Sequence, residues 1–314
     1  MQLEQSRITA QDGQSIMVRH WHPELSKGRS KKPLRGVVQI SHGMAEHCER
    51  YAYLAERLGE AGFVTVAHDH RGHGLNKGGR KGHYGDEDGW TKVVDDMASV
   101  RAFAVEHYPD LPLFLLGHSM GSFISLGMLE RKRPPYTGVI LSGSDFTPPL
   151  KFKLAAPIAR AERAVFGAGG RSPVMSFLSF GSFNKDFKPR RTPFDWLSRD
   201  PVQVDRYIND PLCGFDCTNQ LWVDLLEGLA ETFSAHGLKR LENRPYYLFA
   251  GDKDPVGQRG QGVLALANAL KKAGISDITT RLYSEGRHEM LNESNRDEVI
   301  DDLIAWINQQ VNTQ

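Results

Sequence analysis

The stretch LPLFLLGHSMGSFISLGML, residues 111–129, decides the fold. A run of large apolar residues ends at Gly117, and Ser119 stands between Gly117 and Gly121. Small and apolar residues then follow at helical spacing. A buried strand that bends sharply at a serine and continues as a helix is a nucleophile elbow, with the pattern G-x-S-x-G. The sequence therefore predicts that Ser119 has a strained backbone and a hydroxyl that projects above a sheet.

The glycines of this pattern have a steric reason. The bend brings the strand and the helix so close together that neither position 117 nor position 121 has room for a β-carbon. The helix that begins at Ser119 directs its free N–H groups and the positive end of its dipole toward the serine. These groups favour the negative charge of a tetrahedral intermediate, so the elbow predicts acyl-transfer chemistry.

A serine nucleophile needs a general base, and His236 and His288 are the histidines that follow Ser119 in the chain. Folds with this elbow place serine, acid and histidine in that order. His288 directly follows the expected strand ITTRLYSEG, at the end of the strand where open α/β sheets place their active sites. His236 lies near the end of an expected helix. We therefore predict that His288 is the base.

The acid is expected after the preceding strand, PYYLFAGDKD, which offers Asp252 and Asp254. Asp252 could serve only to cap the turn or the helix that follows. Asp254 lies further along the loop, from where its side chain can reach the ring of His288. We predict that Asp254 is the acid.

The oxyanion of the intermediate requires backbone N–H donors. The residue after the nucleophile, Met120, supplies one of them. The other is expected from the loop after an earlier strand, and ISHGMAEH (residues 40–47) fits, with Met44 as the donor. Each such donor typically contributes roughly a hundred- to thousand-fold in rate.

Strands and helices alternate along the rest of the chain, and the strands are almost continuously apolar. This pattern predicts a mostly parallel sheet with helices on both faces. We expect strands within residues 5–21 (a pair around the Asp12–Gly13 turn), 37–40, 63–74, 111–117, 137–143, 245–254 and 278–288. We expect helices at residues 51–61, 90–107, 119–130, 263–272 and 297–308.

Residues 146–218 break this rhythm, since they are rich in Pro, Phe and basic residues and show no clear strand. With eleven Lys and Arg against seven Asp and Glu, this segment carries a charge of +4. A long insertion after a strand usually carries function, so we expect a helical cap at 146–218 on a core formed by 1–145 and 219–314. Its apolar side chains could line an acyl tunnel, rest on a membrane surface or pack on the sheet: Phe152, Leu154, Phe166, Phe177, Leu178, Phe180, Phe183 and Phe187.

The overall composition excludes several classes. The formal net charge is +1, which gives no sign of a nucleic-acid partner. Three cysteines form no disulfide framework, and the pair Cys213 and Cys217 is weak evidence for a metal site. We expect a cytoplasmic protein, because the sequence shows neither a secretory signal nor an apolar run of membrane-spanning length. A short basic linker is expected at residues 27–32.

Together, the motifs SHGMAEHCERY, DHRGHG, GHSMG, GDKDPV and GRHEMLNE resemble the monoacylglycerol lipase and lysophospholipase branch of the α/β-hydrolase superfamily, the group with a serine aminopeptidase-like domain. The resemblance covers residues 37–306. It implies Ser119, Asp254 and His288 as catalytic residues, Met44 and Met120 as oxyanion donors, no metal or organic cofactor, and a cap that ends near NDPLCGF (residues 209–215). It also implies that DHRGHG is structural. Residues 183–200 differ from the animal monoacylglycerol lipases.

The leading interpretation is a serine hydrolase of single-chain lipid esters, with monoacylglycerol as the first substrate and the cap as a possible point of peripheral membrane contact. A lysophospholipase is the close rival, with Arg190 and Arg191 as candidates for binding a phosphate headgroup. A general carboxylesterase is a further alternative. A non-catalytic scaffold of the same fold would be expected to lack at least one catalytic residue. A peptidase would need an acidic anchor for a free amine, which the sequence does not identify.

Overall fold

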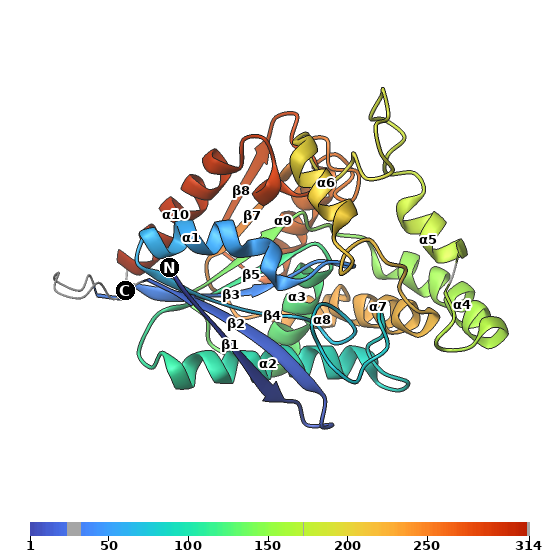
Figure 1. Cartoon of the computed structure of the whole chain (residues 1–314), viewed down its shortest axis with the longest axis horizontal. Coiled ribbons are helices and arrows are strands. Elements are labelled where there is room, and N and C mark those ends of the chain that lie inside the picture. Colours follow the sequence, from blue (N-terminus) through green and yellow to red (C-terminus); the bar gives the residue numbers. More distant parts are fainter. Residues whose placement is uncertain (24–32, 172, 313–314) are drawn as a thin grey trace.

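The computed structural model describes residues 1–23, 33–171 and 173–312, and it excludes the side chains of residues 173 and 178–180. The expected basic linker at 27–32 lies outside the described residues. Within them, the chain forms an eight-stranded sheet with strand order β1-β2-β4-β3-β5-β6-β7-β8 (Figure 1). The strands are β1 (Gln2–Thr9), β2 (Ser15–His22), β3 (Gly36–Ser41), β4 (Phe63–His68), β5 (Leu113–His118), β6 (Gly138–Ser142), β7 (Tyr246–Gly251) and β8 (Ile278–Tyr283).

The sheet is mostly parallel, as the sequence predicts. β1 and β2 form an antiparallel hairpin at one edge, and β2 pairs antiparallel with β4. All the pairs from β4 through β3 to β8 are parallel. The carboxyl ends of β3, β5, β6, β7 and β8 therefore meet at one edge, where the loops that follow them are brought together.

Helices cover both faces of the sheet (Figure 1). The apolar side chains of one core bring α2 (Gly89–His107), α3 (Met120–Lys132), α7 (Asn219–Thr232) and α9 (Gln261–Ala273) onto one face. A second core holds α1 (Ala52–Glu60) and α10 (Arg296–Asn312) on the other. Because strands β3 to β7 are buried at every position, their sequences are mostly apolar rather than alternating. The predicted α/β-hydrolase fold is confirmed.

Residues 146–218 form α4 (Pro149–Phe166), α5 (Pro173–Phe180) and α6 (Pro201–Asn209), joined by turns. The start of α6 has a local cause: Pro201 occupies its first turn, and the Asp200 carboxylate accepts the N–H of Val202 at 2.9 Å. α4 packs along α7, and the segment projects beyond the carboxyl edge of the sheet (Figure 1). The helical character of this segment is confirmed, whereas its status as a separate cap domain stays a prediction.

Among the described residues, no helix has the length and apolar character needed to cross a membrane.

Candidate active site

Ser119 lies in the predicted elbow between β5 and α3. Its backbone has φ 50° and ψ −122°, a conformation that a residue with a side chain rarely adopts. A β-carbon on Gly121 would lie 2.1 Å from the carbonyl oxygen of Ser41, and one on Gly117 would lie 2.6 Å from Cα of Ser122. Both the predicted strain and the predicted need for glycine are confirmed.

The structure brings His288 and Asp254 together at the ends of β8 and β7. The Nδ1 atom of His288 lies 3.0 Å from each carboxylate oxygen of Asp254. Asp254 is completely buried and also accepts the N–H of Val256 at 2.9 Å. Burial alone would lower the pKa of His288, but the Asp254 carboxylate outweighs it and raises that pKa above its usual value. The pair can therefore hold a proton on Nδ1 and leave Nε2 as a base.

Asp252 and His236, the alternative candidates for the acid and the base, lie elsewhere. The Asp252 carboxylate accepts the N–H of Glu285 at 2.7 Å, so it caps the turn after β8 instead of contacting the histidine. His236 is exposed in α8 (Ala235–Lys239) and is not among the residues that line the cavity around Ser119.

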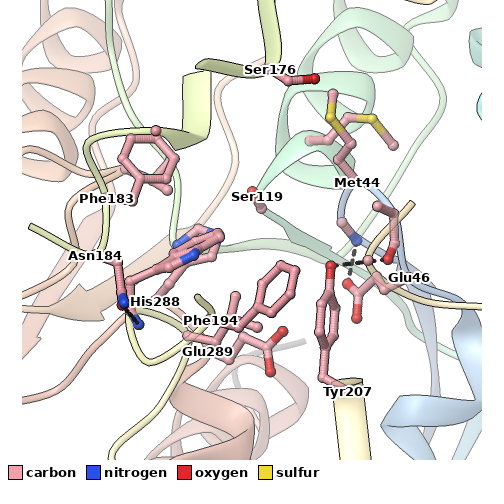
Figure 2. Close-up of a pocket in the computed structure, with 18 of the residues that line it drawn as sticks. Met44, Glu46, Ser119, Ser176, Phe183, Asn184, Phe194, Tyr207, His288 and Glu289 are labelled. Carbon is pink, nitrogen blue, oxygen red and sulfur yellow. Dashed lines mark hydrogen bonds between the residues drawn. The ribbon is translucent and has the colours of Figure 1, made fainter. Parts of the chain in front are cut away.

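The expected oxyanion loop lies directly against the elbow. A β-carbon on Gly43 would lie 3.4 Å from Cβ of Ser119, which places Met44 beside the serine. Met44 and Met120 both line the same cavity as Ser119 and His288. Figure 2 shows Met44 in this cavity with Ser119 and His288. The N–H of Gly43 donates to the Glu46 carboxylate at 2.5 Å, which fixes the turn of this loop.

A cavity of about 990 Å³ opens over Ser119, between the sheet edge and residues 146–218. One wall is apolar and comes mainly from α7 and α4: Phe123, Phe152, Trp222, Leu225, Leu226 and Leu229. Another part of the wall is polar: Glu46, Asn184, Arg190, Arg191, Thr192 and Glu289. The cavity over the serine is therefore lined by both apolar and polar side chains.

The aromatic and apolar residues noted in the inserted segment have separate positions. Phe152 and Phe183 line the cavity, as expected for an acyl tunnel. Leu154, Phe166 and Phe177 instead point to solvent, with exposed fractions of 67%, 57% and 71%. Phe187 packs under the Arg287 guanidinium, whose carbon lies 4.4 Å from the ring centre. Leu178 and Phe180 lie outside the described side chains.

The DHRGHG loop, for which the resemblance implies a structural role, is bonded to neighbouring elements. Arg71 donates to both carboxylate oxygens of Asp96 on α2, at 2.6 and 2.7 Å, and to Asp12 in the β1–β2 turn at 2.8 Å. The ring centre of His73 lies 5.2 Å from that of Phe215, near the end of the inserted segment.

A buried charge cluster beside the site was not predicted from the sequence. Arg50, in the short 3-10 helix η1 (Cys48–Tyr51), donates two hydrogen bonds of 2.6 Å to the Glu289 carboxylate and one of 2.5 Å to Glu46. Burial by itself would raise the pKa of Glu46, but Arg50 outweighs it and lowers that pKa. The cluster joins the oxyanion loop to the residue next to His288. The spacing of E and R in MAEHCER was its only signal in the sequence.

His118, the residue before the nucleophile, is a second buried group that the sequence did not single out. Its ring centre lies 4.8 Å from that of His288. The pKa of His118 is lowered to about 4, mainly by burial and to a lesser extent by the charge of the neighbouring His288. His118 is therefore neutral at neutral pH and does not compete with His288 for a proton.

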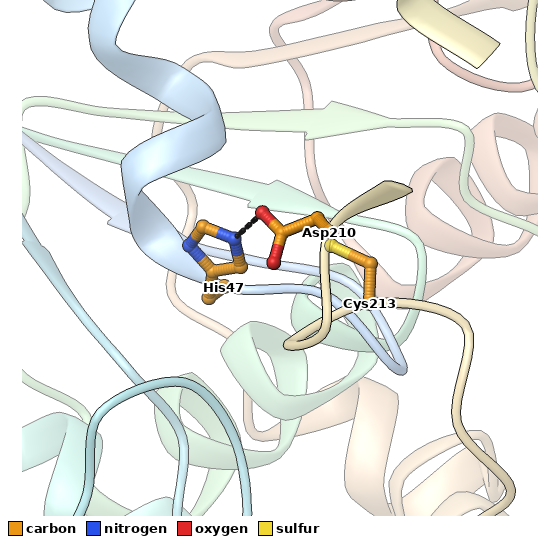
Figure 3. A group of neighbouring side chains, drawn as sticks. All are labelled: His47, Asp210 and Cys213. Atoms are coloured by element: carbon orange, nitrogen blue, oxygen red, sulfur yellow. Dashed lines mark hydrogen bonds and ion pairs between the residues drawn. The ribbon is translucent and has the colours of Figure 1, made fainter. Parts of the chain in front are cut away.

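Among the described residues, His47, Asp210 and Cys213 form a group with metal-ligand chemistry (Figure 3). The group differs from the Cys213–Cys217 pair noted in the sequence. His47 already has a hydrogen-bond partner, because its Nε2 atom lies 2.8 Å from the Asp210 carboxylate. Within the described part of the chain, its other ring nitrogen is buried and has no hydrogen-bond partner, whereas a metal-binding histidine normally donates that N–H to a second group. Burial also raises the pKa of the Cys213 thiol, which disfavours the thiolate that a metal needs. The geometry fits a hydrogen bond between the oxyanion loop and α6 better than a metal site.

Comparison with known proteins supports the same chemistry. The family model described as "Serine aminopeptidase, S33" (Hydrolase_4) matches residues 32–295. A monoacylglycerol lipase of Mycolicibacterium smegmatis is 30% identical over 87% of this chain and 88% of its own length. A monoglyceride lipase of Mus musculus is 28% identical over 96% of this chain and 89% of its own. A solved carboxyl esterase of Bacillus coagulans, in complex with glycerol, is 31% identical, with a TM-score of 0.86 over 99% of both chains.

Proposed function

The chain belongs to the serine aminopeptidase S33 family of α/β-hydrolases and is a serine hydrolase of carboxylic esters, and we propose that its substrates are monoacylglycerols. The observation that carries the proposal is the cavity over Ser119, whose lining combines an apolar wall, mainly from α7, with several polar side chains. A single acyl chain fits against the apolar wall, and a small hydroxylated headgroup can bind to the polar side chains. The relatives named as monoacylglycerol lipases support the same substrate class.

Within this proposal, each site residue has a defined role. His288 takes the proton of Ser119 as its hydroxyl attacks the ester carbonyl. Asp254 holds the tautomer with the proton on Nδ1 and stabilises the imidazolium that forms. The backbone N–H groups of Met44 and Met120 bind the oxyanion. The glycerol leaves with a proton from His288, and water activated by the same histidine then releases the fatty acid.

The first test compares fatty-acid release from monooleoylglycerol by the wild-type protein and by Ser119→Ala. We expect turnover in the wild type and none in the variant, which should keep the wild-type melting temperature. Labelling with a fluorophosphonate probe provides an independent readout, because only an activated serine reacts. Full activity in Ser119→Ala would exclude the proposed nucleophile.

Lysophospholipid hydrolysis is a second candidate, because Arg190 and Arg191 both line the cavity. Arg191 is engaged with Asp205 at 2.6 Å and with the carbonyl of Pro201 at 3.2 Å, so Arg190 is the better candidate for a phosphate. Oleoyl-lysophosphatidylcholine is assayed beside monooleoylglycerol. Faster release from the phospholipid, lost in Arg190→Gln, would favour this second function.

Of the three carboxylates among the described residues that line the cavity, Glu46, Asp216 and Glu289, two are poorly suited to bind the amine of a peptide substrate. An aminopeptidase needs a free carboxylate to bind the substrate amine. Glu46 and Glu289 line the cavity, but both are hydrogen-bonded to Arg50. Their charge is therefore largely compensated within the protein.

Peripheral membrane contact is part of the proposal and rests on apolar side chains that α4 and α5 expose beside the cavity. The residues with the largest exposed fractions are Leu150 (66%), Leu154 (67%), Val165 (73%), Phe166 (57%) and Phe177 (71%). Apolar side chains grouped in this way are typical of a surface that meets lipid. We expect Leu154→Asp with Phe166→Asp to reduce co-sedimentation with phosphatidylglycerol vesicles and to leave hydrolysis of a water-soluble ester unchanged. Equal co-sedimentation of the wild type and the double variant would refute the proposed membrane contact. The cytoplasmic location stays a prediction.

A further inference from the structure

Residues 194–199 of the inserted segment, here called the strap, are bonded to the loop that carries His288. The N–H of His288 donates to the carbonyl of Trp196 at 3.3 Å, and the N–H of Glu289 donates to the carbonyl of Leu197 at 2.8 Å. The Arg287 guanidinium donates to the carbonyls of Asp195 and Ser198. The strap therefore fixes the backbone on both sides of His288.

The side chain of Trp196 also reaches the ring of His288. The two ring centres lie 5.2 Å apart with an angle of 36° between the planes. Trp196 is 7% exposed, and Phe183 packs its ring against the indole at 5.0 Å and 61°. The backbone N–H of Trp196 donates to the Asn184 side chain at 3.0 Å. The indole is thus held against the histidine by its own segment.

We propose that Trp196 is a positioning residue for the reaction, and that its indole ring stabilises the imidazolium of His288 after the proton leaves Ser119. A cation within about 6 Å of an indole centre is attracted by the negative face of the ring, and the attraction grows where water is excluded. His288 is 3% exposed, so this condition holds at the site. The inference rests on the proposed function, in which His288 is the base.

None of the other groups that we identify around His288 can stabilise its imidazolium in the same way as the indole of Trp196. Asp254 binds Nδ1 from the loop after β7, and it acts at the edge of the ring. His118, at the end of β5, is neutral and offers no charge. Glu46 and Glu289 contribute favourable charge from further away, but they share the Arg50 cation. Trp196 is the aromatic ring against which the imidazole lies on the side of the inserted segment.

The test measures kcat/KM against pH for Trp196→Leu and Trp196→Phe with p-nitrophenyl acetate, whose short acyl group makes little use of the apolar wall. For Trp196→Leu we expect the acidic limb to move to lower pH by roughly 0.4 to 1.5 units, and the plateau of kcat/KM to fall by about two- to thirty-fold. Trp196→Phe should show a smaller shift, because a weaker aromatic face remains. Trp222→Leu, which removes an indole from the apolar wall, should leave the acidic limb in place.

Two outcomes would overturn the proposal. One is a fall in kcat/KM for Trp196→Leu with no shift of the acidic limb, since that result indicates a packing role only. The other is an equal shift in Trp222→Leu. NMR titration of the His288 imidazole in wild type and Trp196→Phe gives the same comparison without turnover. Failure of the wild type to react with a fluorophosphonate would instead refute the proposed function, and the titration would still decide the role of Trp196.

Discussion

At the scale of single residues, the elbow leaves no free space around Gly121. The carbonyl oxygens of Ser41 and His42 would lie 2.1 and 2.4 Å from a β-carbon at that position. Both are backbone atoms of the oxyanion loop and the strand before it, so they cannot move aside without disturbing the site. This contact explains why the helix after Ser119 can lie so close to β3.

Gly121→Ala is expected to lower the free energy of unfolding by about 3 kcal/mol or more, because the methyl group overlaps fixed backbone. Urea unfolding at neutral pH measures this change. Gly79→Ala is the matched control: Gly79 is exposed, and the nearest atom to its β-carbon would lie 3.8 Å away. Its effect should stay within about 0.5 kcal/mol. Equal stability of the two variants would contradict the steric argument.

Asp254→Asn is expected to reduce kcat by roughly ten-thousand-fold, because an amide can hold His288 in the wrong tautomer and cannot stabilise the imidazolium. Hydrolysis of a water-soluble ester measures the loss. In the control Asp252→Asn, the amide oxygen can still accept the N–H of Glu285, so activity should remain near wild type. A loss below tenfold in Asp254→Asn would exclude that residue as the acid.

At the scale of elements, the site is assembled where loops after separate strands meet, and Arg50 on η1 binds two of them. Its partners are Glu46 in the loop after β3 and Glu289 in the loop after β8. Their side chains are 3% and 6% exposed, and that of Arg50 is 10% exposed. The Arg50 guanidinium also lies 4.9 Å from the ring centre of Tyr207 on α6. One cation thus links the oxyanion loop, the histidine loop and the inserted segment.

Arg50→Met is expected to destabilise the protein by about 3–5 kcal/mol, because it leaves two buried carboxylates without a cation. Arg57→Met on α1 is the control, since Arg57 pairs with Asp297 and Asp301, whose side chains are 64% and 65% exposed. That change should cost less than about 1 kcal/mol. The free energies of unfolding in urea give both values, and similar values for the two variants would refute the buried-pair argument.

The sequence predicted the parts of this site that depend on local structure. Ser119 was predicted as the nucleophile from the strand, turn and helix around it, and His288 and Asp254 were predicted from their places after successive strands. The cluster around Arg50 and the contact between Trp196 and His288 could not be found in this way. Residues 196 and 288 are far apart in the chain, and only the packing of the strap on the histidine loop brings them together. The helix α7, which supplies much of the apolar wall, was also not predicted.

At the scale of the whole molecule, a group of neutral histidines lies buried between the sheet edge and the DHRGHG loop. Burial lowers the pKa of His68 and of His73 to about 4, and it lowers that of His42 and His70 well below the usual value. The ring centres of His42 and His70 lie 4.3 Å apart. These side chains bind protons in the unfolded chain at a higher pH than in the folded protein.

The contribution of these histidines to the free energy of unfolding is therefore expected to be fully present above about pH 6.5. It should fall as the pH drops toward 4, because the histidines of the unfolded chain then bind protons more tightly than those of the folded protein. His68 and His73 each contribute roughly 3 kcal/mol over this range. His288, whose pKa is raised, acts with the opposite sign, and so do the buried carboxyl groups whose pKa is raised by burial: Asp96, Glu130, Asp145 and Asp224.

Urea midpoints between pH 7.5 and 4.5 measure this dependence. His73→Gln should reduce the slope with pH whatever its effect on absolute stability, and exposed His236→Gln should not. An unchanged slope in His73→Gln would refute the expectation.

The strap has a consequence for how this enzyme can be recombined with its relatives. In a chimaera of two related enzymes, a helical insertion above the active site is usually exchanged whole, with the crossovers placed where the insertion begins and ends. Here the last part of the insertion supplies the carbonyl partners of the His288 loop, so a foreign segment would bring a backbone that was never matched to this histidine. A chimaera that receives α4 and α5 from a relative should therefore return to the sequence of this protein before residue 194. The strap, β8 and the histidine loop then all come from the same protein.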